Sequence, residues 1–131
     1  MKTLAELKQR LEGHPDIRFK SGDKQLTIHA KDETGFDITV IDEEFQGTVY
    51  FGGWHQHFDT MEEAIQCVGF GLSDECRIKV DRRGATPYCW TLQYRDGDDW
   101  KFDSLTSWVF YPYWRTKSVS YLQNHFITDA G

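Results

Sequence analysis

The amino-acid sequence predicts a single α+β domain over residues 1–131, with three helices on a mainly antiparallel meander sheet of about seven or eight strands. Segments with helical spacing of apolar residues separate longer stretches in which apolar and polar residues alternate. Turn residues such as Gly22-Asp23 and Asp96-Gly97 interrupt the alternating stretches. A length of 131 residues is sufficient for one hydrophobic core. Together these observations indicate one α+β unit.

Helices are predicted near residues 3–12, 60–72 and 116–126. The first two begin at capping boxes, Thr3 with Glu6 and Thr60 with Glu63, in which the threonine hydroxyl accepts from a free N–H of the first turn. The third would begin at Thr116 or Ser118 and bury an apolar stripe at helical spacing.

The first strand pair is predicted from its turn. A two-residue loop at Gly22-Asp23 pairs Phe19 with Leu26 and Ile17 with Ile28. This register places all four apolar side chains on one face of the sheet.

The next strands extend this apolar face. A five-residue loop pairs Ile28 with Ile38, and a strand near residues 48–51 adds two more apolar side chains. On the opposite face His29 is expected beside Asp37, which gives this histidine a structural partner rather than a catalytic role.

In the second half of the chain, the turn after Asp96 decides the register. A loop with an odd number of residues places Tyr94 opposite Trp100 and Leu92 opposite Phe102. We expect this register because it brings the apolar side chains of both strands to one face.

Charge and cysteine content favour a cytoplasmic protein without a nucleic-acid or membrane partner. The 15 basic and 21 acidic residues give a net charge of −6, which on average repels phosphate backbones and anionic lipids. No apolar run approaches the ~20 residues of a membrane helix. The three cysteines are odd in number and lack metal-ligand spacing, so we expect reduced thiols. No sequence motif indicates a cofactor.

The sequence gives only weak evidence for catalytic groups. His55, His57 and Asp59 are spaced so that an extended segment would present two imidazoles and a carboxylate on one side, which is a possible metal site. Cys67 could act as a nucleophile, but it lies close to the apolar stripe of the predicted second helix. An enzyme is therefore the less favoured class.

Aromatic residues make up 15% of the chain and are densest in the tract of residues 108–115. The tract is apolar on both faces, as in a central strand, but Pro112 favours an edge or a strand end because it cannot donate to a ladder. Trp108 is expected in the core, whereas the polar tips of the tyrosines and the arginine are expected at the surface. The candidate binding residues are Trp108, Tyr111, Tyr113, Trp114 and Arg115.

These features predict a non-catalytic interaction module that binds a protein partner or its own copy through the aromatic tract near residues 108–115. One alternative is a small-molecule-binding domain with an aromatic-lined pocket. That pocket would be lined by Trp90, Trp100, Trp108, Tyr111 and Trp114. A second alternative is a metal-dependent or thiol-dependent enzyme.

Overall fold

The computed structural model describes residues 3–124 and residue 126. Over this part of the chain the protein is α+β, with two helices and nine strands. The helices are α1 (Leu4–Glu12) and α2 (Met61–Leu72). The strands before α2 are β1 (Phe19–Ser21), β2 (Gln25–Ile28), β3 (Ile38–Asp42), β4 (Gly47–Phe51) and β5 (Trp54–Phe58). The strands after α2 are β6 (Cys76–Arg83), β7 (Thr86–Asp96), β8 (Asp99–Ser107) and β9 (Lys117–Leu122).

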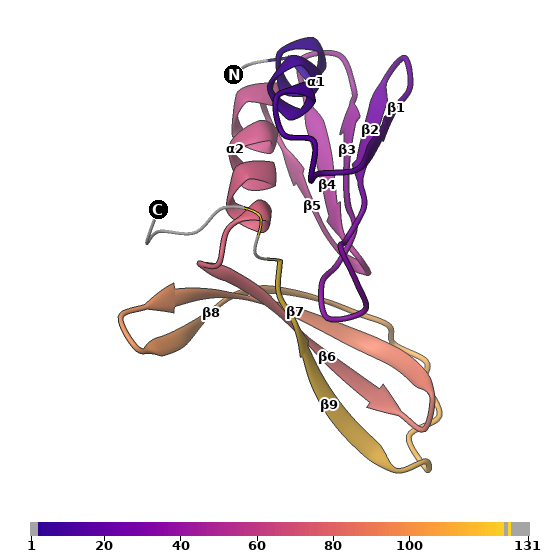
Figure 1. Ribbon diagram of the computed structural model, residues 1–131. Coiled ribbons are helices and arrows are strands. Elements are labelled where there is room, and N and C mark those ends of the chain that lie inside the picture. The colour runs from indigo at the N-terminus through magenta and orange to yellow at the C-terminus, as the bar shows by residue number, and fades with distance from the viewer. Residues whose placement is uncertain (1–2, 125, 127–131) are drawn as a thin grey trace.

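The strands form two antiparallel sheets, which corrects the prediction of one meander sheet. The N-terminal sheet has the order β1-β2-β3-β4-β5, and the C-terminal sheet has the order β8-β7-β6-β9. Both helices lie on one face of the N-terminal sheet, while the C-terminal sheet lies beneath it and extends well beyond it (Figure 1). None of the helices in the described ranges is long and apolar enough to cross a membrane.

Both predicted N-terminal helix boundaries are confirmed. The Thr3 hydroxyl accepts a hydrogen bond from the Glu6 N–H, and the Thr60 hydroxyl accepts one from the Glu63 N–H, each at 3.2 Å. These bonds satisfy donors that the first turn of a helix leaves free, so the capping boxes determine where α1 and α2 begin.

The hydrophobic core lies between the helices and the N-terminal sheet and continues into the C-terminal sheet. Phe51 is fully buried between Phe36, at a ring distance of 5.1 Å, and Trp54, at 4.9 Å. A Cβ at Gly71 of α2 would overlap the Phe51 ring, so glycine lets the helix approach the sheet closely. Apolar residues of β6 and β7 belong to the same buried cluster, namely Cys76, Ile78, Val80 and Leu92.

Pairing in the centre of the N-terminal sheet agrees with the predicted register. Ile28 pairs with Ile38, and Ile38 in turn pairs with Phe51. The first hairpin differs, because Phe19 pairs with Ile28 instead of Leu26. The predicted and observed registers differ by two residues, so they bury the same faces and the apolar pattern cannot separate them.

The predicted third helix is wrong, because its first half forms β9. This strand pairs along β6, with Leu122 opposite Ile78 and Val119 opposite Asp81. Leu122 and Val119 therefore lie on opposite faces of a sheet instead of on one helical stripe. Residue 125 of the predicted helix lies outside the described residues.

The predicted register of β7 and β8 is also wrong. Asp96 pairs with Asp99 across a tight turn in which Gly97 has a φ of +64°. Trp100 consequently lies opposite Arg95, and Phe102 lies opposite Gln93. The register shifts between Leu92 and Gln93, so that Leu92 lies opposite Ser104, and the two strands stay paired beyond this point.

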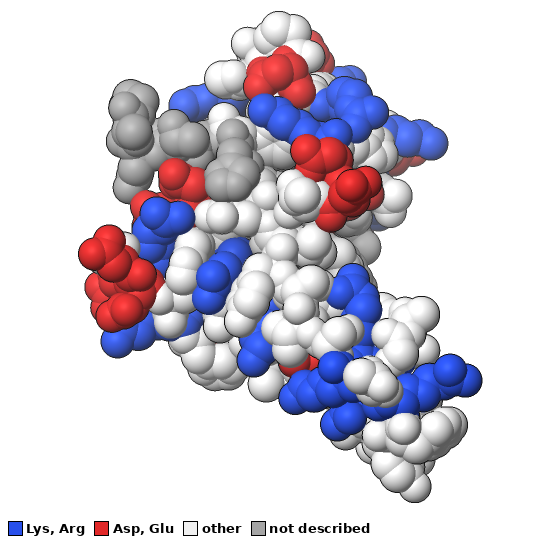
Figure 2. Space-filling model, turned by 60° about the horizontal axis from the view of Figure 1, so that its bottom comes forward, with Lys and Arg blue, Asp and Glu red and all other residues white. Residues whose placement is uncertain are grey.

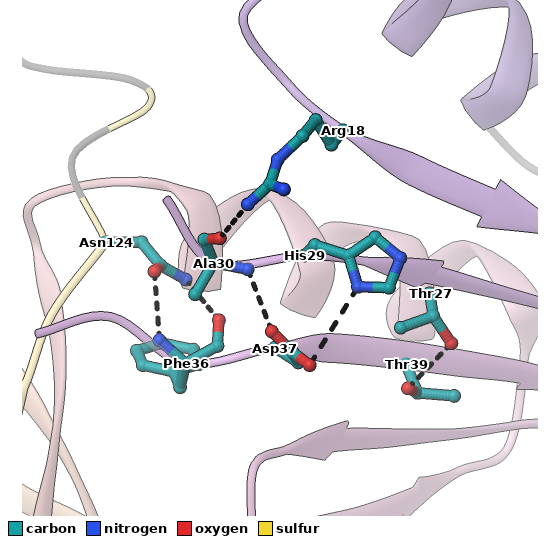
Figure 3. A network of polar contacts seen from close by, with 8 residues as sticks. All are labelled: Arg18, Thr27, His29, Ala30, Phe36, Asp37, Thr39 and Asn124. Carbon is teal, nitrogen blue, oxygen red and sulfur yellow. Dashed lines mark hydrogen bonds and ion pairs between the residues drawn. The ribbon is translucent and has the colours of Figure 1, made fainter. Parts of the chain in front are cut away.

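A buried asparagine in the segment after β9 joins this segment to the N-terminal sheet and to α2 (its bonds to Phe36 are shown in Figure 3). The Asn124 side chain, only 3% exposed, accepts from the Phe36 N–H at 3.1 Å and donates to the Phe36 carbonyl at 3.0 Å. It also donates to the Gly71 carbonyl at 3.2 Å. Nearby, the expected proximity of His29 and Asp37 is confirmed by a distance of 4.0 Å between the imidazole Nδ1 and the carboxylate (Figure 3).

Candidate interaction surfaces

Residues 108–116, called the aromatic loop below, connect β8 to β9 and do not form a strand. Two backbone hydrogen bonds shape it, from the Tyr113 N–H to the Tyr111 carbonyl at 2.8 Å and from the Arg115 N–H to the Pro112 carbonyl at 3.0 Å. Pro112 therefore lies in a turn, where its missing N–H costs no ladder bond.

Two aromatic side chains attach this loop to the C-terminal sheet. The Tyr111 ring stacks on Tyr88 of β7 with ring centres 4.1 Å apart. Trp108 makes an edge contact with Trp90 at 5.7 Å, and its N–H donates to the Tyr88 carbonyl at 2.8 Å. The Trp90 contact lies on the face of the sheet that carries Val80, called the inner face below.

The rest of the aromatic loop is exposed. Phe110 is 91% exposed and Trp114 is 71% exposed, while Tyr113 packs edge-on against Trp114 at 5.3 Å. Trp108 is 54% exposed, which corrects the expectation that it belongs to the core. Tyr111 is half-buried because it stacks on Tyr88. Val109 and Phe110 are exposed apolar residues of the same tract that are not among the candidate binding residues expected from the sequence.

The five aromatic residues of the predicted small-molecule pocket do not all share one face of the C-terminal sheet. Trp90 lies on the inner face, where it packs against Gly53. Trp100 contacts Arg77 and therefore lies on the opposite face, called the outer face below. A common pocket would need these two rings on the same side of the sheet.

His55 and His57 have neighbours of their own on β5. His55 packs against Tyr50 with ring centres 5.4 Å apart. His57 Nδ1 lies 2.9 Å from the Thr48 hydroxyl and 3.4 Å from the Glu43 carboxylate. Across residues 3–124 and 126, no three His, Cys, Asp or Glu side chains are grouped in a way that could hold a metal ion. The predicted alternative site with Asp59 therefore gains no geometric support.

The cysteines are free, and two of them are protected as thiols. Burial, with a smaller contribution from Asp103, raises the pKa of Cys67 from 9.0 to about 12. Burial also raises the pKa of Cys76. Because only the thiolate is a strong nucleophile, neither sulfur is activated at neutral pH.

A second surface, which the sequence did not indicate, is the outer face of the C-terminal sheet. A row of alternating cations and rings crosses it, in the order Arg95, Trp100, Arg77 and Tyr121. The Arg77 guanidinium lies 4.4 Å from the Trp100 ring centre and 4.2 Å from that of Tyr121, and its Nε–H donates to Gln93 at 2.6 Å. Arg77 is thus held in place between two rings.

Further cations and exposed apolar side chains surround this row. Lys79, Arg83 and Lys117 share the face with Arg77, and Phe102 beside them is 61% exposed. Figure 2 shows Lys and Arg side chains gathered over this part of the molecule, with uncharged residues and a small acidic patch between them. The ion pairs of His29, Lys31, His57 and Lys101 involve basic residues that lie elsewhere in the molecule.

Comparisons with protein-family models, with curated proteins and with solved structures found no match to this chain.

Proposed function

We propose that the protein is a non-catalytic interaction module that binds a protein partner, or a second copy of itself, through the aromatic loop. The observation that carries this proposal is the exposure of Phe110 and Trp114 at the tip of a loop that Trp108 and Tyr111 attach to the sheet. Exposed apolar side chains that are grouped, rather than scattered, are typical of binding surfaces.

The composition of the loop fits a protein interface. Aromatic residues and arginine are enriched in such interfaces, and the loop includes Trp114 and Arg115. The stacking of Tyr111 on Tyr88 and the turn at Pro112 limit the freedom of the loop before binding. A loop that is already ordered loses less conformational entropy on association.

Two measurements test this proposal with the same variants. Sedimentation velocity over a concentration series reports self-association, and cross-linking in cells followed by quantitative mass spectrometry reports a different partner. We expect Phe110→Asn combined with Trp114→Asn to weaken the association about tenfold or more, because central aromatic anchors commonly contribute about 2 kcal/mol.

The matched control is Phe45→Asn. Phe45 is 89% exposed in the turn between β3 and β4 and has a φ of +73°, a conformation that asparagine tolerates. This control should retain wild-type association in both measurements. If the loop variant and the control behave alike in both, the aromatic loop is not the binding surface and the proposal fails.

A further inference from the structure

We propose that the outer face of the C-terminal sheet binds single-stranded nucleic acid, with Lys79, Arg83 and Lys117 on the phosphates and the exposed rings of Phe102 and Tyr121 stacking on bases. This site is distinct from the aromatic loop and does not depend on the function proposed for that loop. It combines the two elements that single-strand binding needs, which are a basic surface and accessible ring faces.

The charge of the chain is divided between its two halves. Residues 76–122 hold eight basic and five acidic side chains, a net charge of +3, whereas residues 1–75 hold seven basic and fifteen acidic side chains, a net charge of −8. The overall negative charge therefore hides a positive surface. At physiological salt, charges separated by more than about 8 Å are largely screened, so the acidic half does not cancel a local phosphate site.

Cations on the outer face lie close to one another. Arg83 and Lys117 are directly opposite on β6 and β9, a like-charge pair that an unliganded sheet disfavours. The Arg83 Nε–H is buried and has no hydrogen-bond partner. Arg77 and Arg95 both contact Trp100, at 4.4 Å and 4.9 Å. A polyanion along the face would relieve this repulsion.

Asp81 is the acidic side chain of β6 on this face, and it does not remove the positive character. It is only 8% exposed, and its buried Oδ1 lacks a hydrogen-bond partner.

The exposed rings favour a nucleic acid over an acidic polypeptide. The face of an aromatic ring carries negative partial charge, so it repels a carboxylate but stacks on a base. Phe102 on β8 and Tyr121 on β9 lie on the two edge strands of the sheet, three strand spacings and thus at least about 14 Å apart, further than the ~3.4 Å between stacked bases. The rings therefore suit the separated bases of a single strand and not a duplex, whose base faces are covered.

Fluorescence anisotropy with labelled oligonucleotides tests this proposal. The probes are oligo-U and oligo-dT of about twelve nucleotides, a duplex of equal length, and a labelled poly-glutamate peptide. We expect both single strands to bind, and their affinities to fall about 20-fold between about 50 mM and 200 mM salt if about three phosphates are neutralised. The tighter of the two single strands identifies RNA or DNA as the ligand.

Matched variants separate the charge contribution from the stacking contribution. Lys79→Gln with Lys117→Gln should weaken binding and flatten its salt dependence, whereas Lys8→Gln with Lys20→Gln, exposed lysines of the other half, should leave both unchanged. Phe102→Thr should weaken binding about fivefold or more at any salt concentration. The Phe110→Asn change in the aromatic loop should not affect oligonucleotide binding.

Several results would overturn the proposal. These are no saturable binding of either single strand at low salt, equal or tighter binding of the duplex, and equal losses in the two lysine pairs. If poly-glutamate binds as tightly as oligo-U and oligo-dT, the face is a site for an acidic polypeptide instead.

Discussion

The two sheets each leave one face uncovered, and these two faces differ in how far their side chains satisfy one another. On the N-terminal sheet, polar residues pair across strands: the Thr27 and Thr39 hydroxyls lie 3.0 Å apart, and Tyr50 packs against His55 (Figure 3 shows the threonine pair). On the C-terminal sheet, cations face cations and Phe102 is exposed.

This difference indicates different roles for the two halves. A face whose polar groups bond to each other needs no ligand to satisfy them. Such a face can remain exposed to water and stabilises the sheet. A face with unpaired cations and exposed rings leaves electrostatic and stacking energy available to a ligand. The acidic half thus provides the scaffold, and the basic half provides the binding surfaces proposed above.

The largest expected effect concerns the covered face of the N-terminal sheet. Phe51→Ala should lower the free energy of unfolding by about 3–5 kcal/mol, because it opens a cavity between α2 and the sheet. Urea unfolding followed by circular dichroism measures this loss. A loss below about 1 kcal/mol would show that the scaffold half is not tightly packed around this ring.

The next prediction concerns the connection between the halves. Asn124→Ala should cost about 2–3 kcal/mol, because the buried Phe36 N–H and two carbonyls lose their hydrogen-bond partner. The control is Gln123→Ala, which removes one half-buried bond to the Asp74 carbonyl and should cost about 1 kcal/mol. Equal losses in the two variants would mean that Asn124 has no special role in joining the halves.

The packing of α2 beside the C-terminal sheet can be tested by pH. The folded state holds the Cys67 thiol neutral, with a pKa of about 12 against an ordinary 9.0. Above pH 9 only the unfolded chain releases this proton, so stability present below pH 9 is lost as the pH rises toward 12. The slope contributed by this thiol is at most about 1.4 kcal/mol per pH unit.

Urea unfolding of the wild type and of Cys67→Ala over this pH range isolates that contribution, because the other titrating groups are shared. We expect the variant to lose less stability between the two ends of the range. Parallel pH profiles would mean that Cys67 is well solvated and that helix α2 packs loosely at this point.

The smallest expected effect is on the outer face. Phe102→Thr should change the free energy of unfolding by no more than about 0.5 kcal/mol, since the side chain is 61% exposed and threonine suits a strand. Thermal unfolding measures this change. A loss comparable to that of Phe51→Ala would place Phe102 in a core and would remove the contrast between the two faces.

Much of the N-terminal half could be predicted from the sequence because its signals are local. The capping boxes at Thr3 and Thr60 satisfy backbone donors within one helical turn, so neighbouring residues alone determine these helix starts. Alternation of apolar residues likewise assigned Ile28 and Ile38 to the buried face. The tract of residues 108–115 was recognised by composition, although its form as a loop was not.

The features that were predicted incorrectly depend on contacts between distant segments. Residues 117–122 have apolar spacing compatible with a helix, but the free edge of β6 offers a full ladder of hydrogen bonds, and the segment forms β9 instead. The observed register of the first hairpin differs from the predicted one by two residues. The same side chains face the core in both registers, so the pattern of apolar residues cannot distinguish them.

The sequence by itself determined the α+β class, the two helices before the C-terminal sheet and the buried face of the N-terminal sheet. The tertiary structure decided the division into two sheets and the strand identity of β9. It also placed Trp100 and Phe102 on an open basic face, where Phe102 is exposed. We expected a loop with an odd number of residues after Asp96 because that register would bring these rings to the apolar face. The tight turn at Gly97 instead places Trp100 beside Arg77 and Arg95. The spacing of apolar residues along the chain indicates which residues could be buried. Sheet edges, turns and cation–ring contacts between distant strands determine which of these residues are buried in the folded protein.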